Sequence, residues 1–500
     1  MTPIKNMVLF LIAFALYLLI VLSSNYWFIG DEGFYAISIF EAIKNGPQLY
    51  ITFLGTPVFW KPFLMIDVYA MLVQPLASVL PPYTAYRIPS ALFSAINVVL
   101  VYHISKEFFE EKKALMISAL YALNPLILLF GTKVFMESLT MSFVFFGLLA
   151  TTHICKKDSK LDWVSAFLGI ALAITGASFS KSTTIGLMAF LIYGMYAFLA
   201  NRKKIWVIAL AGVVSAAVVF IVPFLTKFPD AFFKLYMEDF FTRRIDFETY
   251  PENIISMAAL SSYLIPLLFV SILGIRKLDS KELFLVLWVL PLPVIMLMTP
   301  YVWYGYYFVL PLVAISLMGI SPSNKIDMAI VIAMLVLGLL IYAGAEASHS
   351  QISELKTIEY MEKHIEREQC ILYVGALSPM TIAYLEVSGH NFNAIINNAA
   401  IDKKANGTST IILDANLTQE QLQVAVYDYM NVRFAEDISN RKYLFAQWKG
   451  PGSNLRLKSI NKKCSDFEYV IVTDYYKRLT INGYQLVSDE EQMRVWKRQK

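Results

Sequence analysis

The sequence contains little charge for its length. Only 16% of its 500 residues are Asp, Glu, Lys or Arg, whereas 57% are hydrophobic. A water-soluble fold does not have enough interior for so many apolar side chains, so we expect much of the chain to lie in lipid. The net charge of +4 gives no argument for a nucleic-acid partner, because the positive charges lie in short loops between apolar runs.

Several catalytic motifs are also missing. The five histidines form no cluster with the spacing of a zinc site, and no Walker A loop or serine-nucleophile motif occurs. The sequence therefore gives no support to a zinc hydrolase, a P-loop NTPase or a serine hydrolase. The first apolar run lacks a small-residue cleavage site and is followed by further apolar runs, which favours an uncleaved first helix over a secretory signal.

About eleven apolar runs have the length of a membrane-spanning helix, which predicts a polytopic α-helical membrane protein. These runs lie near 7–27, 88–105, 114–131, 138–155, 163–180, 183–200, 205–225, 254–274, 283–300, 305–320 and 327–345. Alternate loops between the runs are rich in Lys and Arg, and such loops stay in the cytoplasm. The pattern predicts a plasma-membrane protein with a cytoplasmic N-terminus and two sizeable outer loops, about 28–86 and 226–253.

A further apolar segment, 62–80, would reverse the sides of all later basic loops if it crossed the membrane. Asp67 in its middle and Pro75 near its end make a lipid-exposed helix costly. We therefore expect an interfacial or re-entrant segment within the first outer loop.

The pattern changes after residue 350 and divides the chain into two predicted domains. Residues 1–345 are expected to form a transmembrane domain, and residues 346–500 a small α/β domain outside the cytoplasm. In the second domain, helix-like segments alternate with short apolar runs such as 371–377 and 468–474. Such runs are typical of buried strands, and their alternation with helices is compatible with a parallel sheet.

Cys370 and Cys464 each precede one of these predicted strands, on the side of the membrane where disulfides form. A bridge between the two cysteines requires adjacent strands, which the sequence does not establish, so the pairing stays open. Cys155 falls at the cytoplasmic end of a predicted span and is expected to be inert.

An acidic pair, Asp31-Glu32, follows the first predicted span and begins an amphipathic helix that ends at Gly46-Pro47. In structural terms Asp31 is a good helix N-cap. In functional terms, a carboxylate at the outer membrane surface can take a proton from a hydroxyl group. The two interpretations are compatible, because capping holds a carboxylate in place.

Other charged residues collect at the same predicted surface. Glu137 is either an ordinary polar loop residue or the second acid of a hydroxyl-activating or metal-assisted site. Lys61 is either an interfacial snorkelling lysine or a cation that binds a phosphate. Lys181 lies in a short turn, and Arg243-Arg244 lie in an aromatic-rich loop, where the planar guanidinium fork suits phosphate. Together these residues predict a site for a substrate with a lipid tail, a phosphate and a polar head.

The order of these features resembles the C-type glycosyltransferase superfamily. Within it, the sequence looks like the branch of protein O-mannosyltransferases and of bacterial aminoarabinose transferases that act on lipid A. The similar stretches are the Asp-Glu pair, K-P-x-L at 61–64, YRIPSALFSAINVVLVYHISKEFF, ALNPLILLFGTKVFMESL, SFSKSTTIGL and YYFVLPLVAISLMGI. They cover roughly residues 1–345, and their order and spacing carry the resemblance more than any single motif does.

The resemblance implies an inverting, mannosyltransferase-like transfer of a hexose or pentose. The donor would be a polyprenyl (dolichyl or undecaprenyl) phosphate sugar, and the acceptor a hydroxyl of a protein, glycan or lipid at the outer face. Asp31 would be the general base. Glu32 and Glu137 would support the acceptor site or a metal. Which sugar and which acceptor are used, and whether a divalent metal takes part, stay open.

The same resemblance assigns the cations. Lys61, with Arg243 or Arg244, would bind the donor phosphate, and Lys181 is a further candidate at that surface. Fixed cations stabilise the charge that grows on a departing phosphate.

The sequence departs from the family pattern at Trp60, Phe63, Ser182 and Tyr306. Trp60 stands where the lipid A enzymes carry an acidic residue, which puts a metal site that depends on that residue in doubt. Tyr306 stands where the family has an arginine, so one family cation is missing there.

Two rival functions remain. A transporter or flippase for a lipid-linked saccharide would place charges deep in helix centres and would contain inverted repeats and broken helices. The candidate charges collect at the outer ends instead, and no convincing repeat is visible. The outer domain could also be a binding module on a membrane anchor, but about eleven spans exceed what an anchor needs and leave the acidic pair unexplained.

Overall fold

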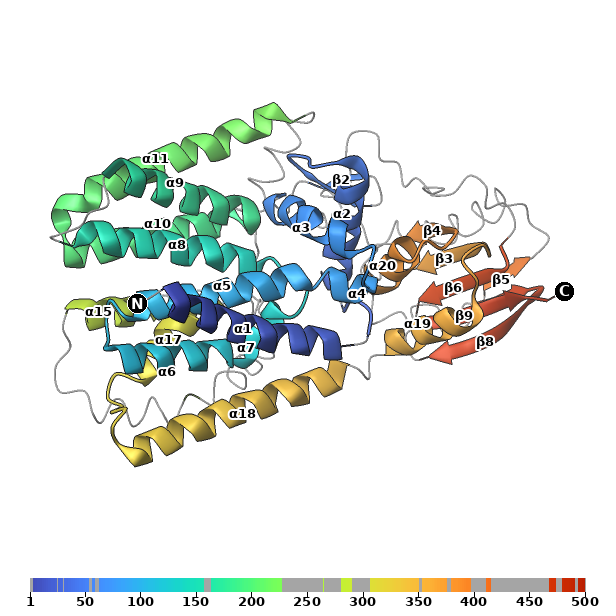
Figure 1. Cartoon of the computed structure of the whole chain (residues 1–500). Helices are drawn as coiled ribbons and strands as arrows, with labels where there is room; N and C mark the ends of the chain where they lie inside the picture. The colour runs from blue at the N-terminus through green and yellow to red at the C-terminus, as the bar shows by residue number, and fades with distance from the viewer. Residues whose placement is uncertain are drawn as a thin grey trace.

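The computed structural model describes residues 3–24, 26–29, 31–53, 56–58, 63–156, 163–226, 264, 280–289, 306–349, 353–375, 379–396, 411–414, 467–473, 479–490 and 493–499. Within these ranges the chain is mostly helical, with a mixed sheet near its C-terminus (Figure 1).

Seven of the described helical segments are long and apolar enough to cross a membrane. The spans are built from α1 (Pro3–Ser23), α4–α5 (Pro82–Ala85 and Ile88–Ser105), α8 (Glu137–Cys155), α9 (Trp163–Ser180), α10 (Thr183–Ala200), η1–α11–η2 (Arg202–Lys204, Ile205–Ile221 and Val222–Leu225) and α18 (Lys325–His349). Each lies on one of the predicted apolar runs, so the prediction of a polytopic helical membrane protein is confirmed. Most of the predicted spans between residues 254 and 320 fall outside the described residues. Only α15 (Ser280–Val289) and α17 (Val309–Ser316) are described there.

The predicted span 114–131 is a bent pair, which would be an eighth crossing if its two halves form one span. α6 (Glu111–Ala122) and α7 (Pro125–Gly131) meet at 61°. The bend has a local cause, since Asn124 caps α7 by accepting a hydrogen bond from the Leu126 amide at 2.9 Å. Pro125 follows at the first helical position, where it starts a new helix and cannot continue the old one.

Two shorter helices and a small hairpin lie between α1 and α4. α2 (Asp31–Asn45) ends where Gly46 adopts a φ of +82°, a value that side chains disfavour. β1 (Ile51–Phe53) and β2 (Thr56–Val58) form an antiparallel pair. α3 (Leu64–Leu76) has 13 residues and is only about 20 Å long, so it is too short to cross a bilayer core of about 30 Å. The length of α3 agrees with the prediction that this segment does not cross the membrane, and its interfacial or re-entrant position stays a prediction.

The helices pack closely in the way that membrane helices do. α8 lies between α5 and α9, and α1 packs on α5. Small residues make the close approach possible, because a Cβ added at Gly147 would come within 2.6 Å of the Ala173 Cβ on α9. Polar groups also link the helices, since the Asn97 side chain donates to the Ser138 carbonyl at 2.8 Å.

The C-terminal elements form a small sheet with helices at one end of the bundle (Figure 1). The five-stranded sheet has the order β4-β3-β6-β9-β8. The elements are α19 (Ser353–His364), β3 (Ile371–Gly375), α20 (Pro379–Val387), β4 (Phe392–Ile396), β6 (Tyr469–Thr473), β8 (Tyr484–Glu490) and β9 (Met493–Arg498). β5 (Ile411–Asp414) and β7 (Leu479–Asn482) form a separate parallel pair.

The α/β character of this region agrees with the sequence prediction. The parallel arrangement holds for β4, β3 and β6, whereas β9 runs antiparallel to both β6 and β8. The sheet is therefore mixed. Cys370, just before β3, is disulfide-bonded, and its predicted partner Cys464 lies outside the described residues. Cys155 is buried and free, as the prediction of an inert thiol requires.

Candidate active site

The acidic pair at the start of α2 contains two different kinds of carboxylate. Glu32 is fully buried. Arg87 donates two charge-assisted hydrogen bonds to its carboxylate, from Nε to Oε1 at 3.0 Å and from Nη2 to Oε2 at 2.9 Å. The amide of Val134 donates to Oε1 at 2.7 Å, and the amide of Ile29 donates to Oε2 at 3.0 Å. Each oxygen of Glu32 therefore accepts two hydrogen bonds.

These contacts fix the charge state of Glu32. Burial alone would raise its pKa, but the Arg87 guanidinium and the hydrogen bonds outweigh burial and hold the pKa below its ordinary value. A carboxylate with every acceptor site occupied cannot readily take a proton from a substrate. Glu32 therefore acts on the site by holding the start of α2 in place.

Asp31, by contrast, is exposed at the first position of α2. The next residue, Glu32, is anchored by Arg87, so the backbone that carries the exposed Asp31 is held in place. A fixed and accessible carboxylate has the properties that a general base needs. The structure therefore gives the two acids different surroundings, and the role of Asp31 as a base stays a prediction.

A short connection of five residues, 132–136, forms the second part of the site, and we name it the α7–α8 turn. The hydrogen bond from Val134 to Glu32 places this turn directly against the start of α2. The ring of Phe135 also contacts Tyr35 of α2, with centroids 6.3 Å apart. Glu137 begins α8 immediately after the turn, so the turn brings the acidic pair and Glu137 to one end of the bundle.

Glu137 is buried and is paired with Lys181. The distance from Lys181 Nζ to Glu137 Oε1 is 2.5 Å, and the lysine side chain is partly exposed. The other carboxylate oxygen, Oε2, is buried and has no hydrogen-bond partner among the described residues. The structure therefore brings together two of the predicted site residues, which lie 44 residues apart in the sequence.

Lys181 follows α9 and directly precedes the N-terminus of α10. The side-chain oxygen of Ser182, which precedes α10, is also buried and without a partner within the described ranges. Free amide groups and the helix dipole make such an N-terminus favourable for an anion. The ring of Phe63 packs against that of Phe179 at 5.3 Å, so α3 and its preceding residue lie beside this turn.

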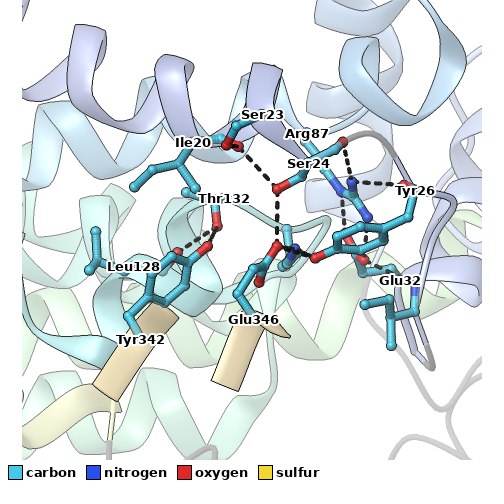
Figure 2. Close-up of polar contacts among 12 residues, drawn as sticks. Ile20, Ser23, Ser24, Tyr26, Glu32, Arg87, Leu128, Thr132, Tyr342 and Glu346 are labelled. Carbon is cyan, nitrogen blue, oxygen red and sulfur yellow. Dashed lines mark hydrogen bonds and ion pairs between the residues drawn. The ribbon is translucent and has the colours of Figure 1, made fainter. Parts of the chain in front are cut away.

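A third ion pair, between Lys133 and Glu346, lies at the same end of the bundle. Lys133 is buried and donates to Glu346 Oε1 of α18 at 2.7 Å and to the hydroxyl of Tyr26. Figure 2 shows Tyr26, Ser24 and Glu346 gathered beside the Arg87–Glu32 pair. Burial, followed by repulsion from Arg87, lowers the pKa of Lys133 to about 8. Two cations and two carboxylates thus share one buried region.

Three predicted phosphate-binding residues, Lys61, Arg243 and Arg244, lie outside the described residues. Both oxygens of Glu32 and one oxygen of Glu137 are already bound to other groups, Arg87 and backbone amides for Glu32 and Lys181 for Glu137. Across the described ranges no three His, Cys, Asp or Glu side chains converge as metal ligands.

Sequence reasoning missed the structural importance of Arg87, Lys133 and Glu346. Arg87 and Glu346 each stand at the end of an apolar run, where a charge must find a partner or reach water. That signal marks both residues as constrained, but it does not reveal which carboxylate pairs with which cation. Such pairing depends on how the helices pack.

The comparison with known protein families matches part of the chain. Residues 67–226 match the family described as dolichyl-phosphate-mannose-protein mannosyltransferase. This segment contains Arg87, Lys133, Glu137 and Lys181, while Asp31 lies outside it. No curated protein sequence matches the chain significantly.

Solved structures show the same fold over nearly the whole chain. ArnT from Cupriavidus metallidurans bound to undecaprenyl phosphate has a TM-score of 0.63 at 13% identity and covers 99% of this chain and 98% of its own. An Archaeoglobus fulgidus oligosaccharyltransferase has a TM-score of 0.51 at 12% identity, with 92% of this chain and 68% of its own covered. The arabinofuranosyltransferase AftD from Mycobacteria has a TM-score of 0.51 at 11% identity, with 98% and 40% covered.

Proposed function

We propose that this chain is a C-type glycosyltransferase that transfers a sugar from a polyprenyl-phosphate carrier to an acceptor hydroxyl, as its partial family match and its shared fold support. The transfer takes place at the extracytoplasmic face of the cell membrane, where the acidic pair and the C-terminal α/β domain lie. The observation that carries the proposal is that a candidate base and a lysine–carboxylate pair lie at the same end of the bundle. An exposed, anchored carboxylate stands beside a turn that leads to a lysine–carboxylate pair.

In this reaction Asp31 takes the proton from the acceptor hydroxyl. The acceptor oxygen then attacks the anomeric carbon from the side opposite the phosphate, and the glycosidic C–O bond to the phosphate breaks. Polyprenyl phosphate leaves with the bonding electrons. A single displacement of this kind inverts the configuration at the anomeric carbon.

The departing phosphate needs positive charge that is already in place. Lys181 supplies it, because Glu137 holds its ammonium at 2.5 Å and two N–H donors remain for the phosphate. Lys61, Arg243 and Arg244 are proposed as further cations at the same group. The second oxygen of Glu137 is buried and lacks a partner among the described residues, so it can accept a hydrogen bond from a hydroxyl of the sugar or acceptor.

A structure with undecaprenyl phosphate exists for ArnT, which shares the fold. That ligand supports a polyprenyl phosphate as the carrier in this chain as well. The transferred sugar is proposed to be a hexose or pentose, with dolichyl- or undecaprenyl-phosphate mannose as the first donors to test. Protein, glycan and lipid acceptors should each be tested in a separate assay.

The test is a transfer assay with the purified chain in liposomes and radiolabelled polyprenyl-phosphate sugars. We expect wild-type protein to release polyprenyl phosphate and label an acceptor. Lys181→Met should lower turnover roughly 100-fold, because one fixed cation at the leaving group is lost. The matched control is Lys156→Met, which removes a lysine that follows α8 and pairs at 2.8 Å with Glu107 in the connection between α5 and α6. Equal activity of Lys181→Met and wild type would contradict the phosphate role, and no transfer with any donor would contradict the proposed function.

A further inference from the structure

The α7–α8 turn is held by a different neighbour at almost every position. Thr132 shares a hydrogen bond with Tyr342 at 3.2 Å, and the next residue, Lys133, pairs with Glu346 at 2.7 Å. The Val134 amide then donates to Glu32, and the carbonyl of Phe135 accepts from Tyr69 of α3 at 3.3 Å. The backbone is tight here, since the Phe135 amide donates to the carbonyl of Lys133 at 3.0 Å.

Two of these contacts come from the last spanning helix. Tyr342 and Glu346 are four residues apart on α18, so they lie on one face of that helix, as Figure 2 shows. They contact two successive residues of the turn, Thr132 and Lys133. The next residue of the turn is the one that donates to Glu32. The position of α18 is thus connected to the acidic pair through three consecutive residues.

Most members of this connection are shielded from water. Thr132, Lys133 and Glu32 are at most 1% exposed, and the Glu346 side chain is 21% exposed. Removing one partner of such a pair leaves a charge without compensation in a poorly solvated place. Lys133 would then turn to the nearest remaining carboxylate, and it already lies close enough to Glu32 to affect its charge.

We propose that Glu346 and Lys133 are positioning residues for the proposed transfer, through which α18 fixes the α7–α8 turn against the acidic pair. This inference rests on the proposed function for its consequence in catalysis. Asp31 and Glu137 reach their working positions only when the turn is held by α18. Because α18 leads directly into α19, the contact also couples the C-terminal elements to the site.

The test compares Glu346→Gln, Lys133→Met and the double variant. Each single variant should lower kcat about 10- to 100-fold and leave the KM for the polyprenyl-phosphate donor within about twofold, because a displaced catalytic group costs turnover more than binding. The double variant should be no more impaired than the worse single variant, since no unpaired charge remains. Tyr342→Phe removes a hydroxyl that shares a hydrogen bond with Thr132 and interacts with Glu346, but it leaves every charge in place. It should lower kcat by a smaller factor with KM again unchanged, and it serves as the test even if the Glu346 and Lys133 variants do not fold.

Hydrogen exchange of the peptide that covers residues 131–138 gives a readout independent of transfer. Glu346→Gln should raise exchange there, including at the Val134 amide. The matched control is Glu107→Gln, which breaks the ion pair to Lys156 and should leave exchange in this peptide and kcat unchanged.

The exchange measurement also separates the two proposals. If wild-type protein transfers no sugar, the proposed function fails while the exchange result still decides whether α18 holds the turn. Unchanged exchange and unchanged kcat in both Glu346→Gln and Tyr342→Phe would overturn the positioning role. A loss of kcat that only follows the fraction of folded protein, with unchanged exchange, would overturn it as well.

Discussion

Asp31 and Glu32 are neighbours in the chain, yet Asp31 is exposed at the start of α2 and Glu32 is buried. Glu32 is buried and accepts four hydrogen bonds from Arg87, Val134 and Ile29, whereas Asp31 is exposed. The residues alone show two acids at the start of a helix, and the resemblance implies a base at Asp31 and a supporting role for Glu32. The contact that anchors Glu32 could not be predicted from the sequence, because it depends on Arg87, which lies 55 residues farther along the chain.

Asp67 gives a prediction at the same scale. Its carboxylate is half-buried on α3, and burial raises its pKa from 3.8 to about 7, against a smaller opposing effect of the hydrogen bond from the Gln48 amide. Between these two values the folded protein holds a proton that the unfolded chain has lost. Stability should therefore fall as the pH rises through this window.

Asp67→Asn removes this dependence. In detergent, the Tm of the variant relative to wild type should be higher at pH 8 than at pH 5, because only the wild type carries a buried charge at the higher pH. Glu110→Gln, an exposed acid next to α6, should show no such trend. A Tm difference that is the same at both pH values would refute the role of Asp67 burial.

At the scale of helices and strands, the sequence predicts most of the membrane region well. Apolar runs of spanning length leave few alternatives, and α1, α8, α9, α10 and α18 all lie where such runs predict them. The bend between α6 and α7 was missed, although Asn124-Pro125 is its local signal. The apolar run 114–131 has the length of one straight spanning helix, so its length alone does not indicate a bend.

The C-terminal sheet was harder to predict. Apolar runs located β3 and β6, but β8 and β9 carry charged residues on their exposed positions and show little apolar contrast. Strand order and direction depend on long-range pairing, which a single sequence does not show. The mixed sheet therefore appears only in the structure.

At the scale of the whole molecule, the proposed orientation makes a direct prediction. Glu368, exposed near the sheet, should lie outside the cell, and Lys156 should lie in the cytoplasm. Glu368→Cys should react with a membrane-impermeant maleimide in intact cells. Lys156→Cys should react only after the membrane is permeabilised.

Among the described cysteines, Cys155 is buried and Cys370 is disulfide-bonded, and labelling of wild-type protein measures the background from Cys464. Wild-type protein is the control. Labelling of Lys156→Cys in intact cells, with none at Glu368→Cys, would invert the proposed topology and place the acidic pair on the cytoplasmic side.

The account as a whole depends on one anchored, exposed carboxylate acting as the base. The most direct measurement is the single-turnover rate of sugar transfer by Asp31→Asn, with donor saturating and Glu110→Gln as the control. We predict a loss of roughly 1000-fold with the donor still bound, because the variant keeps the fold but cannot accept the hydroxyl proton. A rate within about threefold of wild type, on the scale of a lost surface contact, would contradict the central claim.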